Sequence, residues 1–345
     1  MKSPAHKSYA LASLMAAVAL LTSGCGGGGG DAGTPAPPTA PAVEPPAVTS
    51  VPAAVFDDPR RKSAFDRLNE FRALAGVGLL RQNKLADQAA QAHSAYQIFN
   101  NTVTHDETNG AQGFTGQTPF ARLHAVGLIP LTDFTTDSEV AATWDYSAGV
   151  SNYTGGVPNE AGANLIDSLI GTPFHRIRML RPDFAEAGFG VYNNGKSATI
   201  TVDLMRNDKN IQGAPNTIAI IWPPDGQTNV PTVMHSEEPD PIPENNGSPA
   251  GYPASLQINI LFRSVDANTF RIIDPSGNEV PTKLLTYKLN TSNGDHSFTA
   301  AVPKSPLKKG TRYSVIFDGV ISDDKDGIIP LKKNWSFTTG QKEIF

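Results

Sequence analysis

Residues 172–206 decide the fold of the first half of the chain, and they read TPFHRIRMLRPDFAEAGFGVYNNGKSATITVDLMR. Apolar and polar residues in this stretch predict strands over residues 187–192 and 198–205. Asn193-Asn194-Gly195 lies between them and is typical of a tight hairpin turn, because Asn and Gly tolerate positive φ. The stretch therefore predicts an antiparallel pair of strands.

Helical patterns precede this hairpin. Asp58-Pro59 can begin a helix, because Asp caps free N–H groups and Pro fits the first turn. Further helices are predicted from Asn83, from Thr118-Pro119 and over residues 160–170. The apolar positions expected to face the core are Phe65, Leu68, Phe71, Leu85, Ala89, Ala92, Tyr96, Phe99, Phe120, Leu123 and Val126. Helices followed by a hairpin sheet predict an α+β domain over residues 57–208.

The C-terminal part of the chain has a different pattern. Residues 214–345 contain about seven short strand patterns separated by turns such as Pro275-Ser276-Gly277, and no convincing helix. This pattern predicts a second, all-β domain with a sandwich architecture. Residues 234–252 are polar and rich in proline, and we expect them to form a loop between strands.

The N-terminus has the features of an export signal. A positive start is followed by an apolar run over residues 9–21, which is shorter than the roughly 20 residues needed to span a bilayer. We interpret residues 1–24 as a signal peptide. The segment Leu21-Thr22-Ser23-Gly24-Cys25 resembles the lipobox of bacterial lipoproteins, which implies cleavage before Cys25 and a lipid on its thiol. Gly26 follows, and by resemblance to Gram-negative lipoproteins this implies sorting to the outer membrane.

Composition supports an exported, tethered protein. Cys25 is the only cysteine, so the chain can form no internal disulfide. Residues 25–56 are rich in Gly, Pro and Ala and lack apolar periodicity, which predicts a disordered tether. The net charge is −5, and no run of Lys and Arg exceeds three residues. These charges argue against nucleic acid as a partner.

Four stretches of residues 66–206 are similar to the CAP superfamily (cysteine-rich secretory proteins, antigen 5 and pathogenesis-related proteins), in particular to its bacterial SCP-like branch. They are Leu68–Arg72, Leu85–Tyr96 with Thr104-His105, Ser138–Ala141, and the block from Thr172 to Gly190. The resemblance implies an α-β-α sandwich. The second domain resembles a bacterial Ig-like module, with Trp222–Gly226 at its start and Phe337–Gly340 at its end.

The CAP resemblance also implies a ligand groove, with His105, Glu139 and His175 in the positions of the family's histidines and glutamate. Two imidazoles and a carboxylate can bind Zn²⁺ or another divalent metal and leave one position for water. Such a water can act as a nucleophile near neutral pH. We therefore expect the three side chains in one open pocket that faces away from the Ig-like domain. The alternative is a polar groove in which they hydrogen-bond one another without metal.

Three functions fit these observations. The first is a binding module for a small apolar, glycan or other cell-envelope ligand, displayed extracellularly or in the periplasm by its lipid anchor. The second is a metal-assisted hydrolase of envelope or extracellular polymers that uses His105, Glu139 and His175. The third is a purely structural role in envelope attachment. The sequence shows no complete catalytic constellation, so we assign no catalytic residue, favour the first function and leave open whether the protein is an enzyme.

Overall fold

The structure is a computed structural model that describes residues 47–128, 138–148, 150, 152–206, 219–258, 263–286, 296–323 and 327–341. The predicted signal peptide, Cys25 and most of the predicted tether lie outside these residues. Among the described residues, no helix is both long and apolar enough to cross a membrane.

The first domain is built on a four-stranded sheet with the order β1-β3-β4-β2. Its strands are β1 (Arg81–Gln82), β2 (Ser138–Asp145), β3 (Phe184–Asn193) and β4 (Ser197–Arg206). The predicted hairpin is confirmed, because β3 and β4 pair antiparallel around Gly195, which has a φ of 86°. β2 pairs antiparallel with the other edge of β4 and places Glu139 opposite Asp203.

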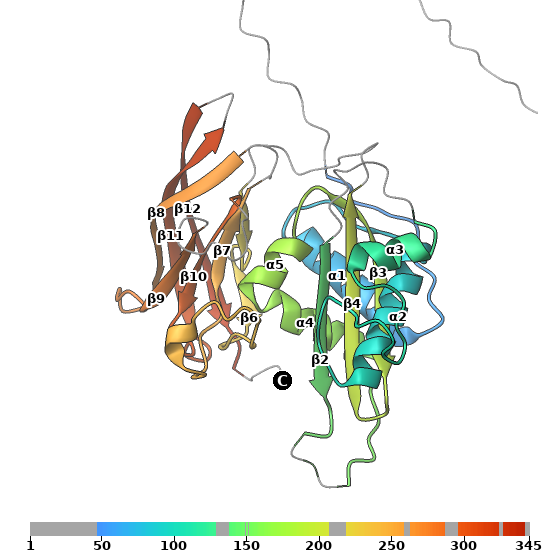
Figure 1. Cartoon of the computed structure of the whole chain (residues 1–345). Coiled ribbons are helices and arrows are strands. Elements are labelled where there is room, and N and C mark those ends of the chain that lie inside the picture. Colours follow the sequence, from blue (N-terminus) through green and yellow to red (C-terminus); the bar gives the residue numbers. More distant parts are fainter. Residues whose placement is uncertain are drawn as a thin grey trace, which may run out of the picture. The chain divides into compact units, whose positions relative to one another are not determined.

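Helices cover both faces of this sheet, as expected for an α-β-α sandwich (Figure 1). The helices are α1 (Pro59–Leu74), α2 (Lys84–Asn100), α3 (Pro119–Ala125), α4 (Ala161–Ile170) and α5 (Pro173–Met179). On one face, Ile200 and Val202 of β4 share a core with residues of α1 and α4. On the other face, the hydroxyl of Thr201 accepts hydrogen bonds from Ser94 and Gln97 of α2. Side-chain alternation along β4 thus separates an apolar face from a more polar one.

Two glycines bring α2 against β3. A Cβ at Gly188 would lie 2.2 Å from the carbonyl carbon of Ala86, and one at Gly190 would lie 2.2 Å from that of Ala90. This close approach explains where the sequence analysis was wrong about side-chain burial. Small alanines form the contact face of α2, and larger apolar residues lie at its margin. On α2, Leu85 and Phe99 were predicted to be buried but are exposed; Phe120 of α3 was also predicted to be buried and is exposed.

The predicted helix starts are confirmed by their caps. The Asp58 carboxylate accepts from the backbone N–H of Arg60, and the Asn83 side chain accepts from Leu85 and Ala86. The first family-like stretch, Leu68–Arg72, stabilises the fold through hydrogen bonds. Asn69 bonds both backbone groups of Leu80, and the buried Arg72 donates to four carbonyl oxygens. Those carbonyls belong to Gly78, Met179, Arg181 and Phe184.

The tether prediction is wrong for the residues just before α1. The carbonyl of Val48 accepts a hydrogen bond from Leu79, and Val55 exchanges two with the side chain of Gln82. The Phe56 ring lies 5.8 Å from that of Phe65 in the core of the domain. A few apolar residues are enough to hold this extended segment on the domain, although it has no periodic pattern.

The second domain consists of two four-stranded sheets, so the all-β prediction is confirmed. One has the order β5-β7-β10-β9, from β5 (Ile220–Trp222), β7 (Ala254–Gln257), β9 (Thr282–Thr286) and β10 (Phe298–Pro303). The other has the order β6-β12-β11-β8, from β6 (Gln227–Val230), β8 (Arg263–Ile273), β11 (Arg312–Asp323) and β12 (Gly327–Thr339). The segment predicted as a loop contains a short 3₁₀ turn, Pro243–Asn245, and a single bridge between Val233 and Gly251.

The apolar core continues from the first domain into the second. The Phe71 ring of α1 meets Trp222 of β5 edge-on at 5.4 Å. The buried guanidinium of Arg176 donates to the carbonyl of Pro253 and to the hydroxyl of Ser255. Gln257 of β7 donates to the carbonyl of Ile177 at 3.1 Å. The two domains are therefore joined through α1, α5, β5 and β7.

Candidate functional site

The structure brings His105 and Glu139 together. The Nδ1 atom of His105, in the loop after α2, lies 2.9 Å from Oε1 of Glu139 on β2. The other oxygen of Glu139 accepts a hydrogen bond from Arg122 of α3 at 2.5 Å. Glu139 is buried, while the His105 side chain is 55% exposed. Only the imidazole of this pair therefore reaches the solvent.

A second buried carboxylate lies beside this pair. Glu107 Oε1 is 2.9 Å from Nδ1 of His93, and its carboxylate also accepts from the backbone N–H groups of Thr115 and Gly116. The Nε2 atom of His93 bonds the carbonyl of Thr104 at 2.7 Å. Both nitrogens of His93 are thus engaged within the protein, in line with a packing role. The sequence analysis missed Glu107, although it stands two residues after His105.

The Glu139 carboxylate is held in its charged form by its neighbours. Burial favours the neutral acid, but the hydrogen bond from His105 and the charge of Arg122 outweigh burial, so the pKa of Glu139 lies below its usual value. The pKa of Asp183 is lowered in the same way, because Arg181 and Arg206 outweigh the effect of its burial. Both carboxylates are therefore ionised near neutral pH.

We expect these two carboxylates to make the fold sensitive to acid. Because their pKa values are lower in the folded than in the unfolded protein, the unfolded protein takes up protons first as the pH falls. The stability they contribute should be complete above the unfolded pKa of about 4 and should decline below it. Urea unfolding at pH 7, 5, 4 and 3 tests this. A Glu139→Gln variant should lose less stability than the wild type between pH 5 and pH 3, and an equal loss would contradict the assignment.

His175 lies in a different arrangement. Its Nδ1 atom is 2.8 Å from Oε1 of Glu237 and 2.9 Å from the hydroxyl of Thr172. The buried Glu237 carboxylate also accepts from the backbone N–H groups of Phe174 and His175 at the start of α5. Glu237 belongs to the segment predicted as a loop of the second domain. The expectation that His175 faces away from that domain is therefore wrong.

The residues present do not fit the predicted metal site of His105, Glu139 and His175. Among the described residues, no group of three or more His, Cys, Asp or Glu side chains is arranged to hold a metal ion. Glu139 already uses both oxygens on His105 and Arg122, and His175 uses Nδ1 on Glu237. His105 and Glu139 lie together, but His175 pairs with Glu237 from a distant segment, and nothing local in the sequence indicated that partner.

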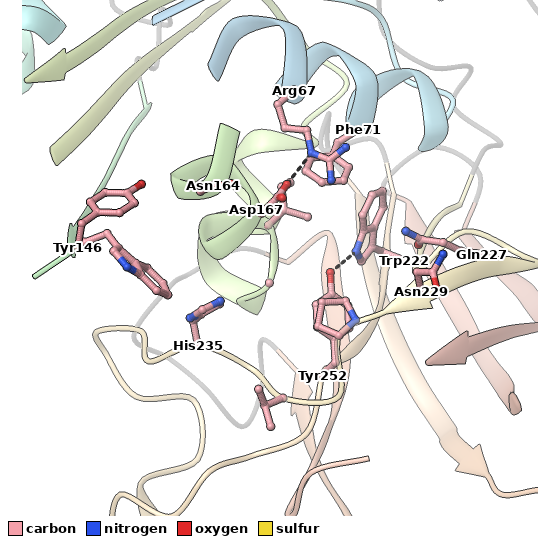
Figure 2. A pocket seen from close by; sticks show the side chains of 15 residues that line it. Arg67, Phe71, Tyr146, Asn164, Asp167, Trp222, Gln227, Asn229, His235 and Tyr252 are labelled. Atoms are coloured by element: carbon pink, nitrogen blue, oxygen red, sulfur yellow. Dashed lines mark hydrogen bonds and ion pairs between the residues drawn. The ribbon is translucent and has the colours of Figure 1, made fainter. Parts of the chain in front are cut away.

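A cavity of about 290 Å³ lies where the two domains meet (Figure 2). The first domain supplies residues from α1, β2 and α4 and from the turns that follow β2 and α4. The second domain supplies residues from β5, β6 and the loop up to β7. Its lining side chains are Arg67, Phe71, Trp144, Tyr146, Asn164, Asp167, Ile170, Gly171, Trp222, Gln227, Asn229, Pro231, Val233, His235 and Tyr252.

Aromatic rings and a partly buried ion pair shape the cavity wall. Trp222 donates its indole N–H to the Tyr252 hydroxyl at 2.9 Å, and Trp144 meets His235 edge-on at 5.7 Å. The Nε atom of Arg67 donates to Asp167 at 2.6 Å. Burial raises the pKa of Asp167, and the bond and charge of Arg67 offset part of that rise. The wall thus includes aromatic rings and an ion pair in which Arg67 and Asp167 neutralise each other.

Two buried polar atoms at the cavity residues have no hydrogen-bond partner in the described part of the chain. They are the hydroxyl of Tyr146 and the amide oxygen Oε1 of Gln227. The amide of Asn164 lies close enough to the Tyr146 hydroxyl to moderate the rise in its pKa that burial causes, yet no hydrogen bond of normal geometry forms. Both atoms are fully buried, so neither is open to the space that a ligand could enter.

Sequence reasoning did not find this cavity. It identified Trp222 only as the start of the second domain. No motif joins the lining residues, because they span positions 67 to 252. Two of the three tryptophans in the chain line the cavity, but their positions in the sequence give no signal of it.

Comparisons with known proteins identify the first domain. Residues 65–204 match the sequence model of the cysteine-rich secretory protein family, CAP. Among solved structures, an outer surface protein from Borrelia burgdorferi aligns with 46% of this chain and 100% of its own, at 13% identity and a TM-score of 0.33. An extracellular protein containing an SCP domain from Bacillus anthracis aligns over 45% of each chain, at 20% identity and a TM-score of 0.32.

A third solved structure, BmVAL-1, aligns with 46% of this chain and 81% of its own, at 14% identity and a TM-score of 0.28. No curated protein sequence matches the chain. The family assignment therefore rests on the sequence match, which includes His105, Glu139 and His175, and it agrees with the α-β-α layers described above. Residues 65–204 form a CAP domain and belong to the cysteine-rich secretory protein family.

Proposed function

We propose that this protein is an exported, lipid-anchored binding module that holds a small ligand in the cavity between its CAP domain and its all-β domain. The observation that carries the proposal is the cavity itself, whose lining combines the aromatic ring of Trp144 with the polar side chains of Asn164 and Asn229. Small-molecule sites in proteins are typically concave and apolar, with a few polar groups that orient the ligand. The cavity has each of these features.

The hydrolase alternative receives less support. Glu139 is neutralised by Arg122 and His105, and His175 is bonded to Glu237. Neither the Glu139 carboxylate nor the Glu237 carboxylate is placed to activate a water, because the oxygens that a base would use already accept hydrogen bonds. The exposed imidazole of His105 has one acidic neighbour but no second catalytic group at bonding distance among the described residues.

The anchor part of the proposal rests on the N-terminal sequence. The apolar run and Cys25 have the order of a lipoprotein signal, and the second domain would act as an Ig-like support for the CAP domain at the cell envelope. Metabolic labelling with an alkyne-tagged fatty acid should mark the wild-type protein and not a Cys25→Ser variant. Equal labelling of the two would remove the anchor from the account.

Ligand binding itself is tested by thermal unfolding in the presence of candidate ligands. A ligand at 100 times its dissociation constant stabilises the folded protein by about 2.7 kcal/mol, which shifts the midpoint by several degrees. We expect this shift to disappear in a Trp144→Ala variant, because Trp144 lines the cavity, and to persist in His105→Ala. Loss of the shift in His105→Ala alone would place the ligand at the His105–Glu139 pair instead.

A further inference from the structure

One strand of the second domain has an edge that is only partly covered. β12 pairs with β11 from Gly327 to Thr338. On its other side, β6 pairs only with the end of β12, at Phe337 and Thr339. Within the described part of the chain, no strand pairs with the outer side of residues 327–335. We call this stretch the open edge of β12.

The open edge presents backbone hydrogen-bonding groups at every second residue. Ser336, which follows it, donates its N–H to the Asp225 carboxylate at 2.9 Å and accepts at its carbonyl from the N–H of Gly226 at 2.7 Å. Both groups of Ser336 therefore point away from β11. In an antiparallel strand these groups alternate between the two sides. The residues that point outward along the open edge are thus Ile328, Pro330, Lys332 and Asn334.

The side chains of the open edge include two exposed isoleucines. Ile328 is 72% exposed and Ile329 is 37% exposed, and they are the only exposed large apolar side chains among the described residues of the second domain. Ile329 shares a face of β12 with Leu331, which is only partly buried against the core. A strand laid along the open edge would pair its outward backbone groups and cover these apolar side chains together.

Two lysines and a proline decide which partner the open edge accepts. Lys332 pairs with Asp318 of β11 at 2.7 Å, whereas Lys333 is exposed and has no ion-pair partner among the described residues. A second copy of the chain would bring the same positive charges to the contact. It would also bring a second Pro330, which has no N–H to donate, so a further hydrogen bond would be missing. The open edge therefore disfavours self-pairing and favours a partner strand that is acidic.

We propose that the open edge of β12 binds an extended segment of another protein as an additional antiparallel strand, with an acidic side chain opposite Lys333 and apolar side chains opposite Leu331 and Ile329. These three residues would lie in the non-hydrogen-bonded positions, where facing side chains are closest. The partner segment then reads acidic-x-apolar-x-apolar from its N-terminus. Addition of a strand to a sheet edge is a common mode of peptide recognition. This site is separate from the cavity and does not depend on the ligand proposed above.

Fluorescence anisotropy with a labelled peptide, Thr-Thr-Glu-Thr-Val-Thr-Val-Thr-Thr, tests the proposal. Its glutamate lies opposite Lys333 and its valines lie opposite the two apolar residues. The peptide should bind the full chain saturably, and amide hydrogen exchange at Ile328, Lys332 and Asn334 should slow in the complex. A control peptide carries N-methyl groups on its second and fourth residues, whose N–H groups would donate to the carbonyls of Asn334 and Lys332. This control should not bind.

An exchange of charges tests the chemistry of the partner. Lys333→Glu should weaken binding of the glutamate peptide about fivefold, the effect of a facing charge pair, and a peptide with lysine in place of glutamate should restore it. Lys304→Glu is the matched control. It changes the net charge equally, but Lys304 is exposed after β10 in the other sheet. That variant should bind the glutamate peptide as the wild type does.

Lys332→Pro tests the backbone contact from the side of the protein. It removes an N–H that points outward and that β11 does not use, so the variant should keep its fold. We expect weaker binding of the glutamate peptide with an unfolding midpoint close to that of the wild type. The N-methylated peptide makes the same test without altering the protein.

Three results would overturn the proposal. If the glutamate peptide shows no saturable binding, or the N-methylated peptide binds equally well, the open edge is not a site for strand addition. If Lys333→Glu and Lys304→Glu weaken binding equally, Lys333 does not select an acidic partner. If sedimentation shows a dimer of the chain that Lys332→Pro abolishes, the open edge pairs with a second copy instead.

Discussion

A Gly190→Ala variant is expected to lose about 3 kcal/mol or more of its folding free energy, or to fail to fold. A Cβ at this position would lie 2.2 Å from both the carbonyl carbon and the carbonyl oxygen of Ala90. Both atoms belong to the backbone of α2, which cannot move without shifting the whole helix away from β3. Gly190 itself is fixed in the middle of β3 by its pairing with Thr201. Neither side of the contact can adjust locally.

Urea unfolding followed by circular dichroism measures this effect. Gly76→Ala is a suitable control, because Gly76 has a φ of 72° and no atom within 4 Å of a Cβ at that position. That variant should lose only about 1 kcal/mol, the cost of placing an L-residue in a left-handed conformation. Similar losses in the two variants would show that the contact between β3 and α2 is looser than described.

An Arg122→Met variant should be destabilised by about 3–5 kcal/mol at pH 7, because it removes the arginine from a cluster with two buried carboxylates. Arg122 bonds Glu139 at 2.5 Å, and its Nε atom lies 3.9 Å from Glu107. Without the guanidinium, burial would dominate and the pKa of Glu139 should rise above its unfolded value. The variant should then regain part of its stability as the pH falls from 7 towards 5, because the folded protein would take up a proton more readily than the unfolded protein.

Unfolding free energies at pH 7 and pH 5 test both parts of this prediction. Lys62→Met is the matched control, because Lys62 and Asp66 form an exposed ion pair on α1. Exposed pairs contribute at most about 1 kcal/mol, so the control should change little at either pH. A loss in Arg122→Met no larger than in Lys62→Met would show that the buried cluster does not depend on its arginine.

The parts of the fold that the sequence predicted are those encoded locally. The hairpin depends on Asn193-Asn194-Gly195, and the starts of α1 and α2 depend on the caps Asp58 and Asn83. In each case the signal and the structure lie within a few residues. β2 was not predicted as a strand, because its residues were assigned only to a family-like motif, and its pairing partner β4 begins about 50 residues later.

The candidate site could be predicted only in part for the same reason. The resemblance placed His105 beside Glu139 correctly, because both belong to the CAP domain. It could not indicate that His175 pairs with Glu237, since Glu237 comes from a segment outside that domain. The cavity depends on the same junction, where Trp222 of one domain meets Phe71 of the other. Contacts between domains are set by surface fit, which a local pattern does not encode.

A crystal structure of the protein with a ligand that stabilises it in thermal unfolding would test the central claim most directly. The account predicts that the ligand lies in the cavity where the two domains meet, in contact with Trp144. A ligand bound at the exposed imidazole of His105, with the cavity unoccupied, would contradict it.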